Sequence, residues 1–185
     1  NQDTYDKERA IDMPVLISFI EKTQPKQWKR YVTKYGAKAE KQLYRVFQDD
    51  VSRYGLIYVL RKGISDMGIN IRFCYFAPAS LLNDELVANY DANILTVTRQ
   101  FAYSKLNKNT IDMVLSLNGI PVVALELKNQ ITGQNVEDSK RQLCTDRDQK
   151  DPLFHCNNRR LAYFAVDLYE VALITEKKKK KTFFI

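Results

Sequence analysis

"NTIDMVLSLNGIPVVALELKN" at residues 109–129 is the stretch that decides the fold. It predicts two apolar β-strands joined at an Asn-Gly turn. Asp112, Glu126 and Lys128 interrupt the apolar pattern. Because an unpaired charge is costly to bury in a protein core, these three ionisable groups need an explanation beyond packing.

The register of the predicted hairpin decides whether these groups can act together. Side chains two apart on a strand share a face, so Glu126 and Lys128 project together and Leu127 points the other way. Asp112 joins their face only if it lies directly opposite Glu126. A plain two-residue Asn-Gly turn would place Asp112 opposite Leu125 instead. A functional cluster therefore requires a three-residue loop or a β-bulge in this hairpin.

Two carboxylates and an ammonium at one end of a sheet suit a hard divalent cation. Mg²⁺ prefers oxygen ligands and keeps several waters, so Asp112, Glu126 and the carbonyl of Leu127 are the candidate metal ligands. Lys128 could position or deprotonate an attacking water and balance charge on a phosphate. Metal-assisted phosphodiester hydrolysis needs these roles. The residues alone leave open a buried pair in which Lys128 only neutralises a carboxylate.

Composition excludes several other classes of protein. The formal charge is +7, of which Lys177–Lys181 supply five units, and 7 − 5 leaves +2 for the rest, so charge alone is weak evidence for a polyanion partner. Three cysteines without CxxC spacing indicate reduced thiols in a cytoplasmic protein. A single histidine, His155, argues against a zinc hydrolase or a His-based nucleophile. No apolar run reaches the length of about 18 residues that a membrane span needs, so no membrane association is expected.

The order of the predicted elements indicates an α/β domain with a mixed β-sheet. Helices are predicted over residues 7–35 (two helices separated at Gln24-Pro25), 37–62 and 134–149. Strands are predicted over residues 69–78, 93–104, 161–167, 170–176 and 182–185, and the two-stranded hairpin over residues 111–128. Residues 80–90 fit a short helix or an ordered loop, and the five consecutive lysines fit a solvated hairpin loop.

Longer words of the sequence resemble a known family in consistent order. They are VLRKGI (59–64), YFAP (75–78), NILTVTRQFAYS (93–104), the block 111–143, DRD (146–148), PLF (152–154) and FAVDLYEVALIT (164–175). Together they are similar to the N-terminal endonuclease domain of the type I restriction enzyme R (HsdR) subunit. The resemblance covers roughly residues 57–185, which makes it more specific than the three ionisable residues alone.

The resemblance implies a restriction-endonuclease-like PD-(D/E)xK fold over residues 37–185, preceded by a helical extension at residues 1–36. Asp112, Glu126 and Lys128 would be the catalytic triad. The implied activity is cleavage of double-stranded DNA with Mg²⁺, for which Mn²⁺ can substitute.

The resemblance also implies a larger assembly. Helicase domains further along the R subunit would use ATP for translocation, and partner modification (M) and specificity (S) subunits would recognise the DNA sequence. This chain has no GxxxxGK[ST] phosphate loop, so we do not expect it to bind ATP. The absent initiator Met and the apolar end "TFFI" agree with a fragment of a longer motor subunit that lacks its helicase domains.

Three residues are candidates for DNA contacts. The family carries a QxxxY element on the helix after the ExK strand; Gln142 matches its Gln, whereas Asp146 stands where the Tyr is expected. Arg99 and Gln100, on the strand before the hairpin, could line a DNA cleft. Such folds often add an acid from an early helix, and the sequence does not decide between the candidates Glu40, Asp49, Asp50 and Glu85.

Two other functions remain open at this stage. The lost Tyr of the QxxxY element favours a catalytically silent nuclease-like module that docks DNA or a partner subunit. A stand-alone repair nuclease of the same fold is a third possibility, which the apparent truncation of the chain argues against.

Overall fold

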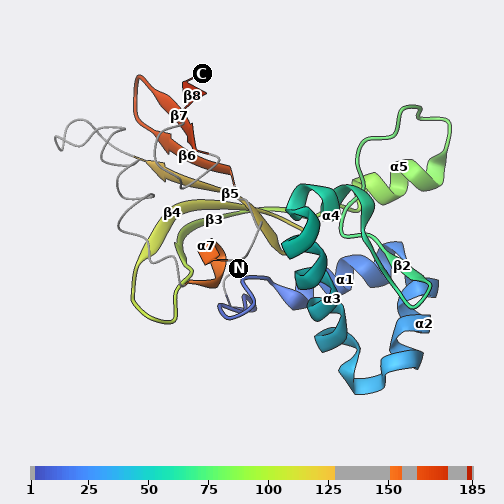
Figure 1. Cartoon of the computed structure of the whole chain (residues 1–185). Helices are drawn as coiled ribbons and strands as arrows, with labels where there is room; N and C mark the ends of the chain where they lie inside the picture. The colour runs from blue at the N-terminus through green and yellow to red at the C-terminus, as the bar shows by residue number, and fades with distance from the viewer. Residues whose placement is uncertain (1–2, 128–150, 156–161, 175–182, 185) are drawn as a thin grey trace.

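The predicted hairpin lies in the middle of a six-stranded β-sheet, and helices pack at one end of that sheet (Figure 1). The computed structural model describes residues 3–127, 151–155, 162–174 and 183–184. The α/β class predicted from the order of elements is confirmed, with its mixed sheet and its N-terminal helical part.

Capping residues and prolines set the ends of the helices. The helices are α1 (Met13–Thr23), α2 (Pro25–Tyr35), a 3₁₀ turn (Gly36–Lys38), α3 (Ala39–Tyr54), α4 (Leu56–Lys62), α5 (Asp84–Asp91) and α7 (Pro152–His155). Asp12 caps α1, because its carboxylate accepts a hydrogen bond from the Val15 amide at 3.2 Å. Pro25 begins α2, where its missing N–H costs no helical bond, so the chain breaks where Gln24-Pro25 predicts. In the described part of the chain no helix is long and apolar enough to cross a membrane.

The single helix predicted over residues 37–62 is wrong. Gly55, with φ 86° and ψ 157°, ends α3 and begins α4. This conformation lies outside the helical region and favours glycine. Val51 and Leu56 are both buried on either side of the break, so the apolar spacing continues across it and hides it from a periodicity analysis.

The strand predicted over residues 69–78 is also wrong for most of its length. Only β2 (Ile69–Ile71) is extended, and it pairs with β1 (Ile64–Asp66) in a separate two-stranded sheet. The rest of the pattern reflects burial in the helical core, where the rings of Phe73 and Phe47 lie 5.0 Å apart. Residues that face a helical core can therefore mimic the alternation of a strand.

The larger sheet is mixed. Its strands are β3 (Leu95–Ala102), β4 (Thr110–Leu117), β5 (Ile120–Leu127), β6 (Ala162–Val166), β7 (Val171–Ile174) and β8 (Phe183–Phe184), in that order across the sheet. All neighbours are antiparallel except β5 and β6, which are parallel. The predicted strands over 93–104, 161–167, 170–176 and 182–185 are therefore confirmed in their central residues. The helix predicted at 134–149 and the lysine loop lie outside the described residues.

The tip of the β4–β5 hairpin connects the sheet to the helical core. Ile120 is fully buried in a cluster with residues of α1, α3 and β2. The Asp12 amide donates to the Gly119 carbonyl at 2.9 Å. The buried Asn118 side chain donates to the Phe73 carbonyl at 2.8 Å. The helical part thus fixes the position of the hairpin from which the carboxylates project.

The helical core draws on residues from both sides of the expected boundary at residue 36. Leu16 and Ile20 of α1 share one buried cluster with Leu43 and Phe47 of α3. The division into a 1–36 extension and a 37–185 domain remains a prediction.

Candidate active site

The β4–β5 hairpin contains the β-bulge that the functional hypothesis requires. Its turn has two residues, since Leu117 pairs with Ile120. The register then shifts between Leu115 and Ser116, and Val122 is left without a cross-strand partner in the pairing. The bulge is confirmed, and the alternative three-residue loop is not what the chain uses.

Beyond the bulge the register brings the two carboxylates onto one face. Val114 pairs with Ala124, and Met113 pairs with Leu125. Asp112 and Glu126 each lie two residues beyond the fully buried pair of Val114 and Ala124, so they project from the same side of the sheet. Glu126 is only 2% exposed. The predicted sharing of a face by Asp112 and Glu126 is confirmed.

Hydrogen bonds from two neighbouring strands orient the carboxylate of Asp112. Its Oδ2 accepts from the backbone N–H of Leu127 at 2.8 Å. Its Oδ1 accepts from the side-chain amide of Gln100, on β3, at 3.1 Å. Because both oxygens are held, the carboxylate has a defined orientation beside Leu127, the residue whose carbonyl is the third candidate ligand.

Gln100 holds this position at a cost in backbone strain. Its φ is 48°, in the left-handed region that non-glycine residues rarely occupy. Its Oε1 accepts a hydrogen bond from the Thr110 hydroxyl at 2.9 Å, while its Nε2 donates to Asp112. Both the oxygen and the nitrogen of the side-chain amide are therefore hydrogen-bonded, and the N–H₂ group points toward the Asp112 carboxylate. Sequence analysis singled out Gln100 for DNA, but it gave no sign of this contact or of the part played by Thr110.

Arg99 lies on the face of the sheet opposite to the one that carries Asp112 and Glu126. It pairs with Met113, which in turn pairs with Leu125. That row of side chains faces away from the row that contains Asp112 and Glu126. The structure therefore brings Gln100 to the carboxylates and does not bring Arg99 there. Its role in DNA binding remains a prediction.

The other predicted site residues need only brief placement. Lys128 and Gln142 lie outside the described residues. Glu40, an acid considered on the early helix, is in an ion pair with Arg9 at 2.8 Å, and Asp49 is in one with Arg45 at 3.5 Å.

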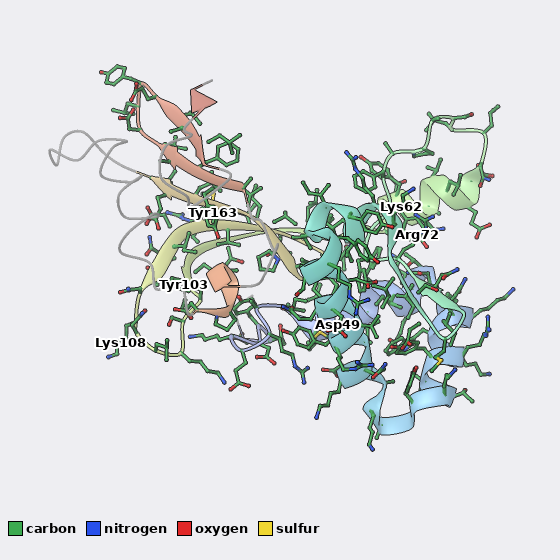
Figure 2. All side chains as sticks on the ribbon, in the orientation of Figure 1. Asp49, Lys62, Arg72, Tyr103, Lys108 and Tyr163 are labelled. Atoms are coloured by element: carbon green, nitrogen blue, oxygen red, sulfur yellow. The ribbon has the colours of Figure 1, made fainter. Side chains whose placement is uncertain are left out.

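An aromatic cluster supports the sheet around the carboxylates. Tyr103 and Tyr163, labelled in Figure 2, are buried in one cluster with Val114 and Ala124. Leu153 of α7 belongs to the same cluster, so this short helix packs close to the site. The low polarity of these neighbours strengthens electrostatic interactions at the site.

Asp151 is a buried acid that sequence analysis did not single out. It is 1% exposed and lies two residues before Leu153, which belongs to that cluster. Its Oδ2 has no hydrogen-bond partner among the described residues. The sequence does contain one indication of it: Asp151 directly precedes Pro152, and an acidic residue followed by proline often marks the start of a helix.

The donor set fits a hard cation such as Mg²⁺. It consists of two carboxylates and a backbone carbonyl, all oxygen donors. Among the described residues no three His, Cys, Asp or Glu side chains gather into a metal-binding group. Mg²⁺ is usually bound by one or two carboxylates together with water and substrate oxygens, and two carboxylates are what this hairpin offers.

The fold and the site together define an α/β domain with paired carboxylates on a central bulged hairpin. The chain matches the family model of the type I restriction enzyme R protein N terminus (HSDR_N) over residues 75–182, which is more than half of its 185 residues. The chain therefore belongs to this family, and its resemblance to the N-terminal endonuclease domain of HsdR is confirmed. The matched span contains the whole of β3, β4 and β5. No curated protein matches the chain.

Proposed function

We propose that this domain is the Mg²⁺-dependent endonuclease of a type I restriction-modification R subunit and hydrolyses phosphodiester bonds of double-stranded DNA. The observation that carries the proposal is the bulged register of β4 and β5, which sets Asp112 and Glu126 on one face. Membership of the R protein N-terminal family supports it independently.

The residues divide the chemistry between them. Asp112, Glu126 and the Leu127 carbonyl would hold the metal, and Mn²⁺ can replace Mg²⁺ in such an oxygen site. The bound ion supplies Lewis-acid stabilisation of the charge that develops on the phosphate. Gln100 and the Leu127 amide keep the Asp112 carboxylate in place. Lys128, the next residue along the chain, would orient or deprotonate the attacking water and balance the phosphate charge.

The complete enzyme would divide its labour among several parts. We propose that helicase domains of the full R subunit hydrolyse ATP and translocate DNA, and that M and S subunits recognise the target sequence. This chain would perform only the cleavage step, in the cytoplasm. Gln142 and Arg99 are proposed to contact DNA.

The test is DNA cleavage by a reconstituted complex of the R, M and S subunits. Asp112→Asn and Lys128→Ala should each lower cleavage by at least about a hundredfold, because transition-state stabilisation is lost, and should leave ATP hydrolysis unchanged. Asp91→Asn, an exposed acid at the end of α5, serves as the matched control and should cut normally. Normal cleavage by either triad variant would refute the assignment.

The replacement of the expected Tyr by Asp146 favours one other function, a catalytically silent module that docks DNA or a partner subunit. Calorimetric titration with Mn²⁺ separates the two functions. An endonuclease binds the ion, and Glu126→Gln weakens that binding; a docking module shows no specific binding in either protein.

A further inference from the structure

Helix α2 and the residues that flank it carry a concentration of positive charge that the proposed catalytic site does not use. Residues 22–38 contain six cations and no acid. The cations are Lys22, Lys26, Lys29, Arg30, Lys34 and Lys38, and all are exposed. The opposite side of α2 is anchored by Tyr31, which is fully buried. The helix therefore has one face in the core and one strongly basic face in solvent.

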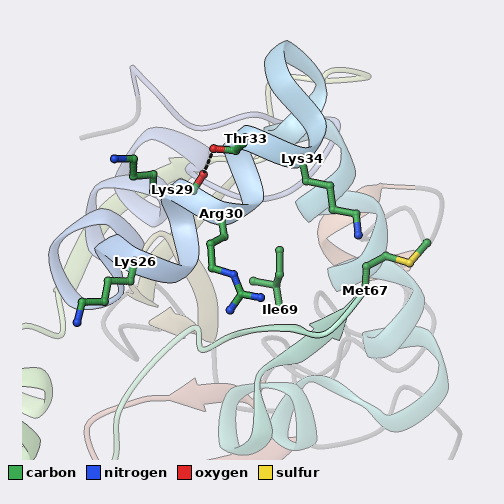
Figure 3. Close-up of a pocket in the computed structure, with 7 residues that line it drawn as sticks. All are labelled: Lys26, Lys29, Arg30, Thr33, Lys34, Met67 and Ile69. Atoms are coloured by element: carbon green, nitrogen blue, oxygen red, sulfur yellow. Dashed lines mark hydrogen bonds between the residues drawn. The ribbon is translucent and has the colours of Figure 1, made fainter.

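The basic face borders a groove of about 530 Å³ between α2 and the turn that joins β1 to β2 (Figure 3). The residues that line it are Lys26, Lys29, Arg30, Thr33, Lys34, Met67 and Ile69. Arg30 and Lys34 extend over Ile69 and Met67, which form the apolar wall (Figure 3). Met67 is 72% exposed. The groove thus combines several cations with an open apolar wall.

Two carboxylates beside this face accept hydrogen bonds from neutral donors. Asp66 Oδ2 accepts hydrogen bonds from the hydroxyls of Tyr31 at 2.8 Å and Tyr35 at 2.9 Å. Glu21 accepts from the indole N–H of Trp28 at 3.0 Å. Burial raises the pKa of Tyr31, so its hydroxyl stays a neutral donor at physiological pH.

The basic face therefore keeps an uncompensated charge. The six cations are the four of α2 together with Lys22 of α1 and Lys38 of the 3₁₀ turn. Subtracting Glu21, Asp66 and Glu85, which lines a neighbouring pocket with Lys26, 6 − 3 still leaves +3. The ion pairs within the described residues use Arg9, Arg45 and Lys105, and none uses a cation of α2.

The spacing of the cations suits a linear polyanion better than a single anion. Lys26, Arg30 and Lys34 are four residues apart, so they form a row with a step of about 6 Å along the helix. Duplex DNA presents a continuous line of charge, one per about 1.7 Å of its axis. The choice of DNA as the polyanion rests on the proposed nuclease function, because DNA is the substrate of that reaction.

From this arrangement we propose that the α2 groove binds the phosphodiester backbone of double-stranded DNA, without sequence preference, and holds the duplex that the nuclease site cuts. The groove lies outside the family match, which begins at residue 75. Figure 1 shows α2 at the end of the molecule opposite the sheet. The groove therefore acts on affinity and does not take part in bond cleavage.

The experiment compares two triple variants of the chain with equal loss of charge. Lys29→Gln, Arg30→Gln and Lys34→Gln remove three of the four cations that line the groove. The control substitutions Arg53→Gln, Arg61→Gln and Lys62→Gln remove three exposed cations from α3 and α4. Glutamine keeps good helix propensity, so both variants should fold. Binding of a labelled DNA duplex is measured by fluorescence anisotropy between about 50 and 200 mM salt.

The groove variant should bind at least about tenfold more weakly at low salt, and its plot of log affinity against log salt should be shallower by about three units. The control variant should show a smaller change in both quantities. Equal slopes for the two variants would overturn the proposal. The proposal would also be overturned if the groove bound an acidic peptide while the groove variant kept the wild-type salt dependence of DNA binding.

One further protein separates this proposal from the catalytic one. Asp112→Asn should bind the duplex like the wild type and fail to cut it within the complex. If that variant still cuts, the proposed active site is wrong, whereas the affinity difference between the two triple variants would still assign the groove.

Discussion

At the scale of single residues, Gln100 shows how a strained backbone and a functional contact coincide. Its positive φ and its hydrogen bonds to Asp112 and Thr110 occur together in the interior of β3. Strain of this kind persists only where surrounding contacts fix it, and it is commonly found at functional sites. We infer that the stabilising contacts offset part of the cost of the left-handed conformation.

Two substitutions separate the strain from the contacts. Gln100→Ala and Gln100→Gly both lose the hydrogen bonds to Asp112 and Thr110, so both should weaken Mn²⁺ binding in calorimetry. Only glycine relieves the left-handed conformation, so Gln100→Gly should be more stable than Gln100→Ala by about 1 kcal/mol in urea unfolding. An alanine variant at least as stable as the glycine variant would contradict the strain argument.

Sequence analysis identified the carboxylates at this scale but not what holds them. Asp112 and Glu126 are visible because charge in an apolar hairpin is unusual. The contact from Gln100 is not visible, because no local pattern reports a positive φ for a glutamine. Asp151 was missed for a similar reason, since its burial depends on the packing of Leu153 with residues far away in sequence.

At the scale of elements, the bulge in β5 is what makes two strands into a site. Counting residues required either a bulge or a longer loop, and could not choose between them. The two-residue turn is fixed by tertiary contacts, because Asp12 and Phe73 form hydrogen bonds with the two turn residues. The helix predicted over residues 37–62 and the strand predicted over residues 69–78 were wrong for a similar reason. The break at Gly55 and the burial of Phe73 against Phe47 both depend on how the helical core packs, which local sequence patterns do not report.

A pair of deletions tests the register. Removing Val122 deletes the unpaired residue and leaves Asp112 opposite Glu126, so Mn²⁺ binding should survive. Removing Leu115 from β4 shifts Asp112 by one position relative to β5, so it no longer faces Glu126 directly and Mn²⁺ binding should be lost. Circular dichroism establishes that each variant folds. A folded Leu115 deletion that still binds the ion would disprove the role assigned to the register.

At the scale of the whole molecule, the hairpin tip couples the helical part to the sheet, and glycine makes that contact possible. A Cβ on Gly119 would lie 2.4 Å from the carbonyl oxygen of Asp12, a contact that real structures do not tolerate. Gly119 also has a φ of 80°. Gly68 is its natural control, because it has a similar φ of 76° with nothing within 4 Å of its ideal Cβ.

Replacing each glycine with alanine therefore isolates the cost of the contact between the two parts. Gly68→Ala should lower the free energy of unfolding by about 1 kcal/mol through backbone strain alone. Gly119→Ala should lower it by about 1–3 kcal/mol more, because either α1 or the turn must move away to accommodate the methyl group. Chemical denaturation of the two variants measures the difference. Equal losses of unfolding free energy in the two variants would mean that the hairpin tip moves to accommodate the methyl group at little cost. The helices would then not fix the position from which Asp112 and Glu126 project.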